Sequence, residues 1–188
     1  MKFICRFVSL QMVPFIHQLS FIINKSFLFR GLLCFLLFLC SCDETKIGDQ
    51  AQGKVINVID GDTFDLLTSV NDTARIRIYG IDAPERSMPF YNVSKKYLND
   101  LCYNKYVTVV VKDIDQYNRI VGSVFSKDDE DLGLAMVKAG LAWHYKYFSN
   151  DDKDLALAEE EARKSSRGLW IDKNPVAPWD YRQQSKKE

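Results

Sequence analysis

The segment Ala74–Ile81 alternates between two kinds of side chain, and this pattern constrains the fold more than any other part of the chain. Ile76 and Ile78 would share one face of an extended segment. Arg75 and Arg77 would share the opposite face. A period of two is typical of a strand that is buried on one side only. We therefore expect a β-sheet protein in which this strand carries basic groups on its open face.

Four other short apolar runs have the composition of strands, and turn signals separate them. Asp60-Gly61-Asp62 lies between the first two runs, and Asn71-Asp72 precedes the alternating segment. The five predicted strands are 54–59, 63–67, 74–81, 106–111 and 120–125. We expect the first three strands to form a meander.

Three segments have the spacing of amphipathic helices, and they are 94–104, 132–139 and 151–165. Ser94 is the expected N-cap of the first helix, and Gly140 and Gly168 would end the other two. Five strands with a helix between the third and the fourth predict an α+β fold. Its centre would be a small five-stranded Greek-key β-barrel of the OB type with three helices.

The charge of the chain gives no reason to expect a basic surface. The 188 residues carry 25 Lys and Arg against 25 Asp and Glu. Residues 1–42 hold four of the bases and no acid, so removing them leaves 21 bases against 25 acids, a net charge of −4. A domain of this charge has no global positive field that attracts nucleic acid, and a polyanion would have to be bound by a local site.

The N-terminal segment is predicted to direct export. An apolar run of residues 31–41 follows Lys25 and Arg30, and it is shorter than the roughly 20 residues that span a membrane. This order is typical of a secretory signal. The run ends in Leu39-Cys40-Ser41-Cys42, which resembles the bacterial lipoprotein box with Cys42 as the lipidated residue. The alternative is an uncleaved signal anchor.

This interpretation divides the chain into four parts and places it in the cell. Residues 1–42 are the predicted lipoprotein signal, 43–52 a polar tether, 53–172 the folded domain and 173–188 a C-terminal tail. The protein would be anchored by lipid to a bacterial cell envelope and face outside the cytoplasm, or else be secreted.

The cysteines agree with this division. Five are present, but three would leave with the signal and Cys42 would carry lipid. Cys102 would then have no disulfide partner, and its place beside Leu98 and Leu101 in a helical pattern predicts a buried, inert thiol. We expect a monomer.

The residues with catalytic potential lie between Asp60 and Arg119. Hydrolysis of a phosphodiester needs groups that neutralise the phosphoryl oxygens and a water molecule aimed in line. A hard divalent cation held by carboxylates, together with arginines, can supply both. The sequence offers this set in Asp62, Arg77, Asp82, Glu85 and Arg119.

Asp62 and Asp82 are the candidate metal ligands. They could share a cation if the first and third strands are neighbours, as we expect of the meander. Ca²⁺ takes 6–8 oxygen ligands, so backbone carbonyls and water would have to complete the shell, which predicts modest affinity. Arg77 would point toward the same space, where its guanidinium could bind a phosphate through two hydrogen bonds.

Each of these residues also has an ordinary interpretation. Asp62 could simply satisfy a turn, and Glu85 could pair with its neighbour Arg86. Arg119 could form a surface ion pair with Asp115, worth about 0–1 kcal/mol. The presence of two Asp, one Glu and two Arg together favours catalysis over these readings.

Five short motifs occur in order along the predicted domain. They are Asp60-Gly-Asp-Thr63, Arg77-Ile-Tyr-Gly-Ile-Asp-Ala-Pro-Glu85, Asp115-Gln-Tyr-Asn-Arg119, Gly140-Leu-Ala-Trp-His-Tyr145 and Ser166-Arg-Gly-Leu-Trp170. Together they resemble the staphylococcal nuclease (thermonuclease) family over about Ala51–Asp172. The resemblance implies an OB-fold and a Ca²⁺-dependent endonuclease that cleaves DNA and RNA with little sequence preference and leaves 3′-phosphates.

The resemblance also implies roles for single residues. Asp62 and Asp82 match metal ligands, and Ala83 matches a position that gives only its backbone carbonyl to the metal. Glu85 matches the carboxylate that activates or orients water. Arg77 and Arg119 match the arginines that bind the scissile phosphate.

Base stacking is the implied role of Tyr117 and of Tyr145 or Tyr147, between which the register is ambiguous. The chain departs from the family pattern at Gln116, where the family has Lys, and at Asn118, where it has Gly. Asn adopts the left-handed conformation more readily than most residues, so the turn is expected to persist.

Two matters stay open at the level of sequence. Mg²⁺ and Mn²⁺ are alternatives to Ca²⁺ as the cofactor. A non-catalytic OB-fold that binds nucleic acid or protein on the cell envelope is the alternative function, although such a module has no need of three acids beside a polyanion.

Overall fold

The computed structural model describes residues 46–186 of the chain. The predicted signal, the lipidation site Cys42 and the first residues of the predicted tether lie outside the described residues.

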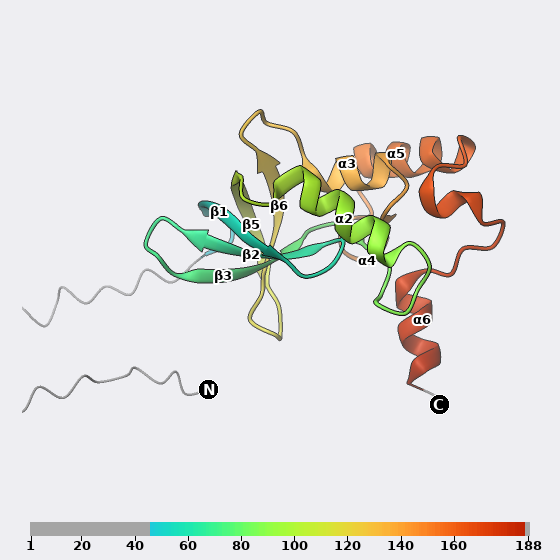
Figure 1. Ribbon diagram of the computed structural model, residues 1–188, viewed down its shortest axis with the longest axis horizontal. Coiled ribbons are helices and arrows are strands. Elements are labelled where there is room, and N and C mark those ends of the chain that lie inside the picture. The colour runs from blue at the N-terminus through green and yellow to red at the C-terminus, as the bar shows by residue number, and fades with distance from the viewer. Residues whose placement is uncertain (1–45, 187–188) are drawn as a thin grey trace, which may run out of the picture. The chain divides into compact units, whose positions relative to one another are not determined.

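Five strands close into a barrel, as predicted (Figure 1). They are β1 (Gln50–Val58), β2 (Thr63–Thr68), β3 (Thr73–Ile78), β5 (Tyr106–Ile114) and β6 (Ile120–Ser126). Their order around the barrel is β1-β2-β3-β6-β5, and β5 pairs again with β1. All pairs are antiparallel except β3 with β6, which is parallel. Helices complete the α+β fold.

The alternating segment that we predicted as one strand is two strands. Gly80 adopts a φ of 77°, a conformation that breaks the extended chain after β3. The chain then forms the short strand β4 (Ile81–Asp82), which pairs with β7 (Trp143–His144) outside the barrel. The turn therefore points Asp82 away from the line of β3.

We expected the first and third strands to be neighbours, and this prediction was wrong. β2 lies between β1 and β3 and pairs with both. Asp62 nevertheless reaches β3, because it stands at the start of β2 and Thr63 pairs with Arg77. A hydrogen bond of 2.9 Å from the amide of Ile78 to the carbonyl of Asp62 extends this pairing by one residue.

The three predicted helices are present with shifted ends. The helices are α2 (Tyr91–Cys102), α3 (Leu132–Lys138), α4 (Lys146–Ser149), α5 (Lys153–Lys164), the 3₁₀ helix η2 (Gly168–Ile171) and α6 (Pro178–Ser185). Ser94 is not a cap, since α2 begins three residues earlier after Phe90. Ser94 is buried inside α2 and donates a hydrogen bond of 2.8 Å to the carbonyl of Leu141.

Two predicted boundaries differ from the structure. β1 begins at Gln50, so the last three residues of the predicted tether belong to the barrel. α6 forms within the segment that we predicted as a tail. Pro178 occupies the first turn of α6, a position where its missing N–H costs nothing.

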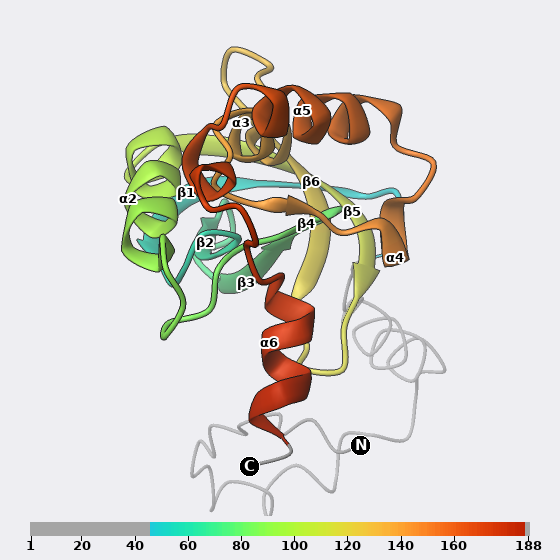
Figure 2. The same ribbon diagram turned by 90° about the vertical axis from the view of Figure 1, so that its right-hand side faces the viewer.

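Alternate residues of the strands form the core. Phe64 and Leu66 of β2 and Ile76 and Ile78 of β3 are almost entirely buried, as the alternating pattern predicted. A second, smaller cluster places Trp143 against other aromatic and apolar groups near η2. Figures 1 and 2 show α3 and α5 side by side at the top of the domain and α6 well below them, apart from both.

None of the helices within residues 46–186 has the length and apolar character needed to cross a membrane. Cys102 is fully buried in α2, and burial raises the pKa of its thiol to about 12. A thiol of this kind is unreactive at neutral pH, as predicted.

Gly140 allows two backbones to meet between α3 and η2. Its φ is 67°, and a Cβ atom there would lie 2.3 Å from the carbonyl oxygen of Arg167. We expect Gly140→Ala to lower the free energy of unfolding by about 1–3 kcal/mol more than Gly48→Ala does. Gly48 has a φ of 91° but no atom within 4 Å of its Cβ position, so the control shares only the backbone strain.

Urea-unfolding midpoints of the two variants measure this difference. Equal losses of stability in both would show that the approach of the two backbones adds no constraint beyond the conformation of the glycine.

Candidate active site

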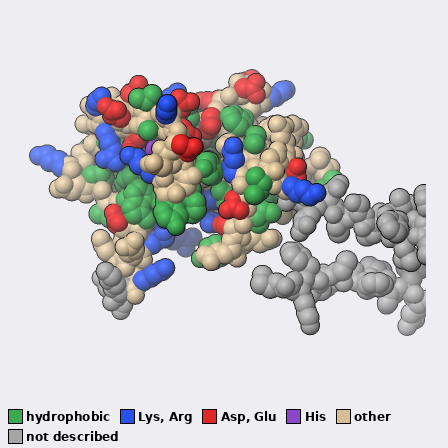
Figure 3. All heavy atoms as spheres, turned by 180° about the vertical axis from the view of Figure 1, so that it is seen from behind, with side chains coloured by type: hydrophobic (Ala, Val, Ile, Leu, Met, Phe, Trp, Pro, Cys, Tyr) green, Lys and Arg blue, Asp and Glu red, His purple; other side chains and the backbone are tan. Residues whose placement is uncertain are grey.

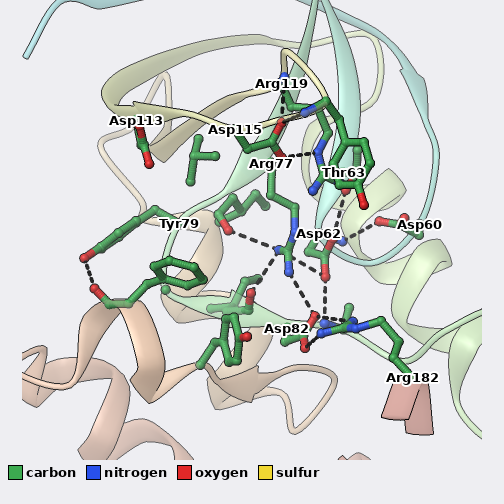
Figure 4. A pocket seen from close by; sticks show the side chains of 18 of the residues that line it. Asp60, Asp62, Thr63, Arg77, Tyr79, Asp82, Asp113, Asp115, Arg119 and Arg182 are labelled. Atoms are coloured by element: carbon green, nitrogen blue, oxygen red, sulfur yellow. Dashed lines mark hydrogen bonds and ion pairs between the residues drawn. The ribbon is translucent and has the colours of Figure 1, made fainter. Parts of the chain in front are cut away.

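A single cavity of about 540 Å³ gathers most of the predicted site residues (Figure 4). Those that line it are Asp62, Arg77, Asp82, Ala83, Glu85, Tyr117, Arg119 and Tyr145. Tyr147 does not line the cavity. Strands β2, β3 and β4, the β5–β6 loop and α6 all contribute to the wall, so the barrel and its connections position the site together.

The guanidinium of Arg77 lies at the centre of the site between two carboxylates (Figure 4). Nη1 is 3.1 Å from Oδ2 of Asp62, and Nη2 is 2.9 Å from Oδ1 of Asp82. Nη1 also donates to the carbonyls of Ile78 and Ile81 at 3.2 and 2.9 Å. Arg77, whose side chain is 14% exposed, is therefore held at several points, which ties the end of β3 to β4.

Asp62 is held from both sides. Its Oδ1 accepts a hydrogen bond of 2.9 Å from the hydroxyl of Thr63, and its Oδ2 accepts one of 2.7 Å from the amide of Ala83. The turn before β2 is satisfied by another residue, because Asp60 accepts the hydrogen bond from the amide of Asp62. The side chain of Asp62 is thus directed into the cavity and does not form the hydrogen bond that closes its own turn.

The acidic side of the cavity holds more carboxyl groups than guanidinium groups. Burial and the neighbouring charge of Asp62 raise the pKa of Asp60 to about 7. Burial also raises the pKa of Asp82, although the hydrogen bond from Arg182 opposes this shift. Four acids, Asp60, Asp62, Asp82 and Glu85, line the cavity together with Arg77 and Arg182.

Arg119 lies on the opposite wall and pairs with Asp115. Nε of Arg119 is 2.7 Å from Oδ2 of Asp115, so the ordinary ion pair considered from the sequence does form. Burial alone would raise the pKa of Asp115, but hydrogen bonds from Arg119 and Tyr117 hold it below its usual range. Nη1 and Nη2 of Arg119 make no hydrogen bond within residues 46–186, so the end of the guanidinium remains available to a ligand.

The loop that carries Arg119 has the predicted conformation. Asn118 adopts a φ of 61°, which confirms that Asn can occupy the position where the family has Gly. The guanidinium of Arg119 also lies 5.5 Å from the centre of the Tyr117 ring, and Tyr117 is 71% exposed.

Glu85 pairs with a residue that the sequence analysis missed. Oε1 of Glu85 is 2.6 Å from Nη1 of Arg182 on α6, so the predicted alternative of a pair with Arg86 is wrong. Nη2 of Arg182 is 2.7 Å from Oδ2 of Asp82. Pro178, which starts α6, was the one signal that a helix follows residue 173.

The aromatic side chains next to the cavity form a stacked group. Tyr145 lies between Tyr147 and Trp179, with ring centres 6.2 and 5.3 Å away. Phe148 packs edge-on against Tyr145 at 5.3 Å. Tyr147 is 81% exposed, so both tyrosines that the resemblance singled out belong to one aromatic surface at the rim.

The donors of the site suit a hard cation better than a soft one. Asp62 and Asp82 offer carboxylate oxygens, and the surplus of acids around them favours a positive ion. Within residues 46–186, no group of three or more His, Cys, Asp or Glu converges as a ready metal site. A cation held here would need backbone carbonyls and water, in line with the modest affinity expected from the sequence.

Charge on the outer surface is mixed. On the face shown in Figure 3, acidic and basic side chains are interspersed. This face has no continuous basic tract, and the arginines of the cavity are the groups placed to receive an anion. The net charge of −4 led us to expect that a local site would bind a polyanion, and the cavity is the candidate for that site.

Comparison with known proteins relates most of the domain to one family. A sequence model of a protein family described as "Staphylococcal nuclease homologue" matches residues 75–172. This region includes β3, the β5–β6 loop and Arg119, but it ends before α6.

Similar proteins carry the resemblance further along the chain. A protein of Haemophilus influenzae named "Uncharacterized endonuclease" is 38% identical over 164 residues, which is 87% of this chain and 89% of that protein. An Escherichia coli protein of the same name is 39% identical over 130 residues, 69% of this chain and 84% of its own length. "Micrococcal nuclease" of Shigella flexneri is 35% identical over 144 residues, 72% of this chain and 82% of its own length.

Removal of the central guanidinium should cost more stability than removal of a surface one. Arg77→Ala leaves the buried carboxylates of Asp62 and Asp82 without their shared cation, and we expect a loss of about 3 kcal/mol or more. Arg75 lies two residues before Arg77 on β3 and pairs with Asp65 of β2 at the surface. For Arg75→Ala we expect a loss of at most about 1 kcal/mol.

Chemical unfolding of both variants at neutral pH compares the two pairs directly. If Arg77→Ala were no less stable than Arg75→Ala, the central guanidinium would not be what holds the two carboxylates together.

Proposed function

Because the chain belongs to the staphylococcal nuclease family, we propose that it is a calcium-dependent endonuclease that hydrolyses phosphodiester bonds of DNA and RNA. It cleaves the bond to the 5′ oxygen with little sequence preference and leaves 3′-phosphates. The names of its relatives in Haemophilus influenzae and Shigella flexneri, an endonuclease and a micrococcal nuclease, support this activity.

One observation carries the proposal. A single cavity is lined by the carboxylates of Asp62, Asp82 and Glu85 and by the guanidinium groups of Arg77 and Arg119. Phosphoryl transfer depends on positioned charge of this kind more than on covalent chemistry. A site with both positive and negative side chains can bind the phosphate through its arginines and hold a water molecule through its carboxylates.

Arg119 is the better placed of the two arginines to bind the scissile phosphate. Its Nε is fixed by Asp115 at 2.7 Å, which orients the guanidinium, while the two terminal nitrogens are left for the non-bridging oxygens. Two parallel N–H···O bonds stabilise the charge that spreads over these oxygens in the transition state. Arg77 is committed to Asp62 and Asp82 and acts from deeper in the wall.

Glu85 is the residue that activates or orients the attacking water. Oε1 binds Arg182, and Oε2 has no hydrogen bond within the described residues, so one oxygen is anchored and one can accept a proton from water. The water oxygen adds to phosphorus as the bond to the 5′ oxygen breaks. The proton goes to Glu85, and the 5′ oxygen leaves with a proton from solvent.

The cofactor in this proposal is Ca²⁺, held by Asp62, Asp82 and the backbone carbonyl of Ala83. When bound, it would polarise a phosphoryl oxygen and neutralise charge on the phosphate. Mg²⁺ and Mn²⁺ are the alternatives, since all three ions prefer oxygen ligands. A site with two carboxylates binds calcium weakly and suits the millimolar concentrations outside cells.

A nucleic-acid-binding module without catalysis explains the site less well. Such a module gains affinity from cations along its groove. Here Asp62, Asp82 and Glu85 would repel the phosphate at the point where the arginines attract it. The acids contribute only if a cation or a water molecule acts between them and the substrate.

We also propose that the domain is attached by lipid to a bacterial cell envelope and faces outside the cytoplasm. Cys42 in Leu39-Cys40-Ser41-Cys42 is the proposed site of lipidation. Metabolic labelling with a radioactive fatty acid should mark the wild-type chain and not Cys42→Ser. Cys40→Ser is the matched control and should stay labelled, whereas loss of label only in Cys40→Ser would assign the anchor to the other cysteine.

The activity is tested on plasmid DNA and on RNA with the purified chain. We expect both to be degraded in millimolar Ca²⁺, and the activity to vanish with a chelator and return with added Ca²⁺. Glu85→Gln keeps the size of the side chain but not its charge, and it should lower kcat about 10²–10⁴-fold. Arg119→Ala should lower it about 10²–10³-fold.

Glu160→Gln is the matched control, since Glu160 is an exposed residue of α5 that pairs with Lys164. It should leave the rate unchanged. Activity that survives the chelator, or that survives the loss of Glu85 and Arg119 together, would contradict the proposed mechanism. Parallel assays in Mg²⁺ and Mn²⁺ identify the preferred metal.

A further inference from the structure

Helix α6 lies beyond the residues that the family model matches, and yet it forms part of the cavity. The match ends at residue 172, whereas α6 spans Pro178–Ser185. Arg182 and Lys186 line the cavity together with residues of the barrel. Trp179 stacks on Tyr145 with ring centres 5.3 Å apart and planes 20° from parallel, which docks the start of the helix beside the site.

The guanidinium of Arg182 spans two carboxylates. Nη2 is 2.7 Å from Oδ2 of Asp82, and Nη1 is 2.6 Å from Oε1 of Glu85 (Figure 4). Nη1 also lies 3.3 Å from Oδ1 of Asp82. Although burial opposes it, hydrogen bonding to these two acids raises the pKa of Arg182 further above its already high value. Arg182 is therefore charged whenever the protein is folded.

These contacts are the main restraint on Glu85. The side chain of Glu85 is 40% exposed, and its carboxylate makes no other hydrogen bond or ion pair within residues 46–186. An exposed Glu side chain samples several rotamers, and ordering it costs conformational free energy. Asp82, in contrast, is also held by Arg77. Loss of the guanidinium of Arg182 would thus release Glu85 more than Asp82.

We propose that Arg182 is a positioning residue of the active site, which holds the carboxylates of Glu85 and Asp82 in the arrangement that the reaction needs. α6 is then an active-site element and not a tail. This inference rests on the proposed function, because it names the residue that orients Glu85 toward water.

The contacts distinguish this role from two others. A phosphate-binding arginine keeps N–H groups free, as Arg119 does, but both terminal nitrogens of Arg182 are directed at carboxylates. An inhibitory plug would fill the site, yet a cavity of about 540 Å³ remains with Arg182 in its wall. The geometry therefore favours positioning over substrate binding or blockade.

The test measures kcat and KM separately for the full chain on a short single-stranded DNA oligonucleotide in millimolar Ca²⁺. Arg182→Ala should lower kcat about 10- to 100-fold, because small displacements of a reacting group have effects of this size. KM should change less than about threefold. Arg182→Lys, which can contact one carboxylate at a time, should recover part of the rate.

Added guanidinium ion at low millimolar concentration should also restore part of the rate of Arg182→Ala, since it can occupy the vacated position between the two acids. A structural defect would not respond in this way. Arg75→Ala is the matched control, because Arg75 of β3 also pairs with an aspartate, Asp65 of β2, but lies outside the cavity. This variant should show neither the loss of kcat nor its rescue by guanidinium ion. Thermal unfolding of each variant monitors folding, and Arg182→Lys carries the test if Arg182→Ala does not fold.

The outcomes separate the two proposals. An active wild-type chain with unchanged kcat in Arg182→Ala overturns the positioning role alone. A higher kcat would identify α6 as a block on the site, and a higher KM at constant kcat would identify Arg182 as a substrate ligand, and either result overturns the proposal. A wild-type chain that is inactive with every metal overturns the proposed function and this inference with it.

Discussion

The site depends on one largely buried guanidinium placed between two carboxylates. Arg77 belongs to the outward face of β3, and the turn at Gly80 brings Asp82 back toward it, while the pairing of β2 with β3 brings Asp62 alongside. Charges this close together and this far from solvent are tolerated only when each has a partner. The position of the ion pair thus follows from the register of the barrel, and the remaining residues of the cavity are arranged around it.

Much of the fold follows from local patterns in the sequence. The alternation around Ile76 and Ile78, the Asp-Gly turn before β2 and the apolar runs of β5 and β6 are short-range signals. They predict the five barrel strands, although β1 begins earlier than expected and β3 ends before Gly80. What the patterns could not give is pairing between distant segments. The parallel contact of β3 with β6 and the separate pair of β4 with β7 depend on tertiary packing, and so does the burial of Ser94 in place of a capping role.

The candidate site was predictable to a similar extent. Acids and arginines within one motif could be expected to lie together, because few residues separate them in the chain. Arg182 is 100 residues from Asp82, and nothing in the composition of the last 16 residues marks it as part of a site. Its role became visible only from contact across the fold. Asp60 is a second case, since its shifted pKa arises from burial that a turn sequence does not reveal.

The way in which the barrel closes has a consequence for how the chain folds. β1 is held by β5 as well as by β2, and the pairing of β1 with β5 joins Gln50 to Val110, which are 60 residues apart in the chain. The loop entropy of such a distant contact must be overcome before its hydrogen bonds contribute. Proteins dominated by long-range pairings fold more slowly than those built from local contacts. The N-terminal strand is therefore synthesised early but acquires its second partner late, and closure is expected to be a slow, cooperative step.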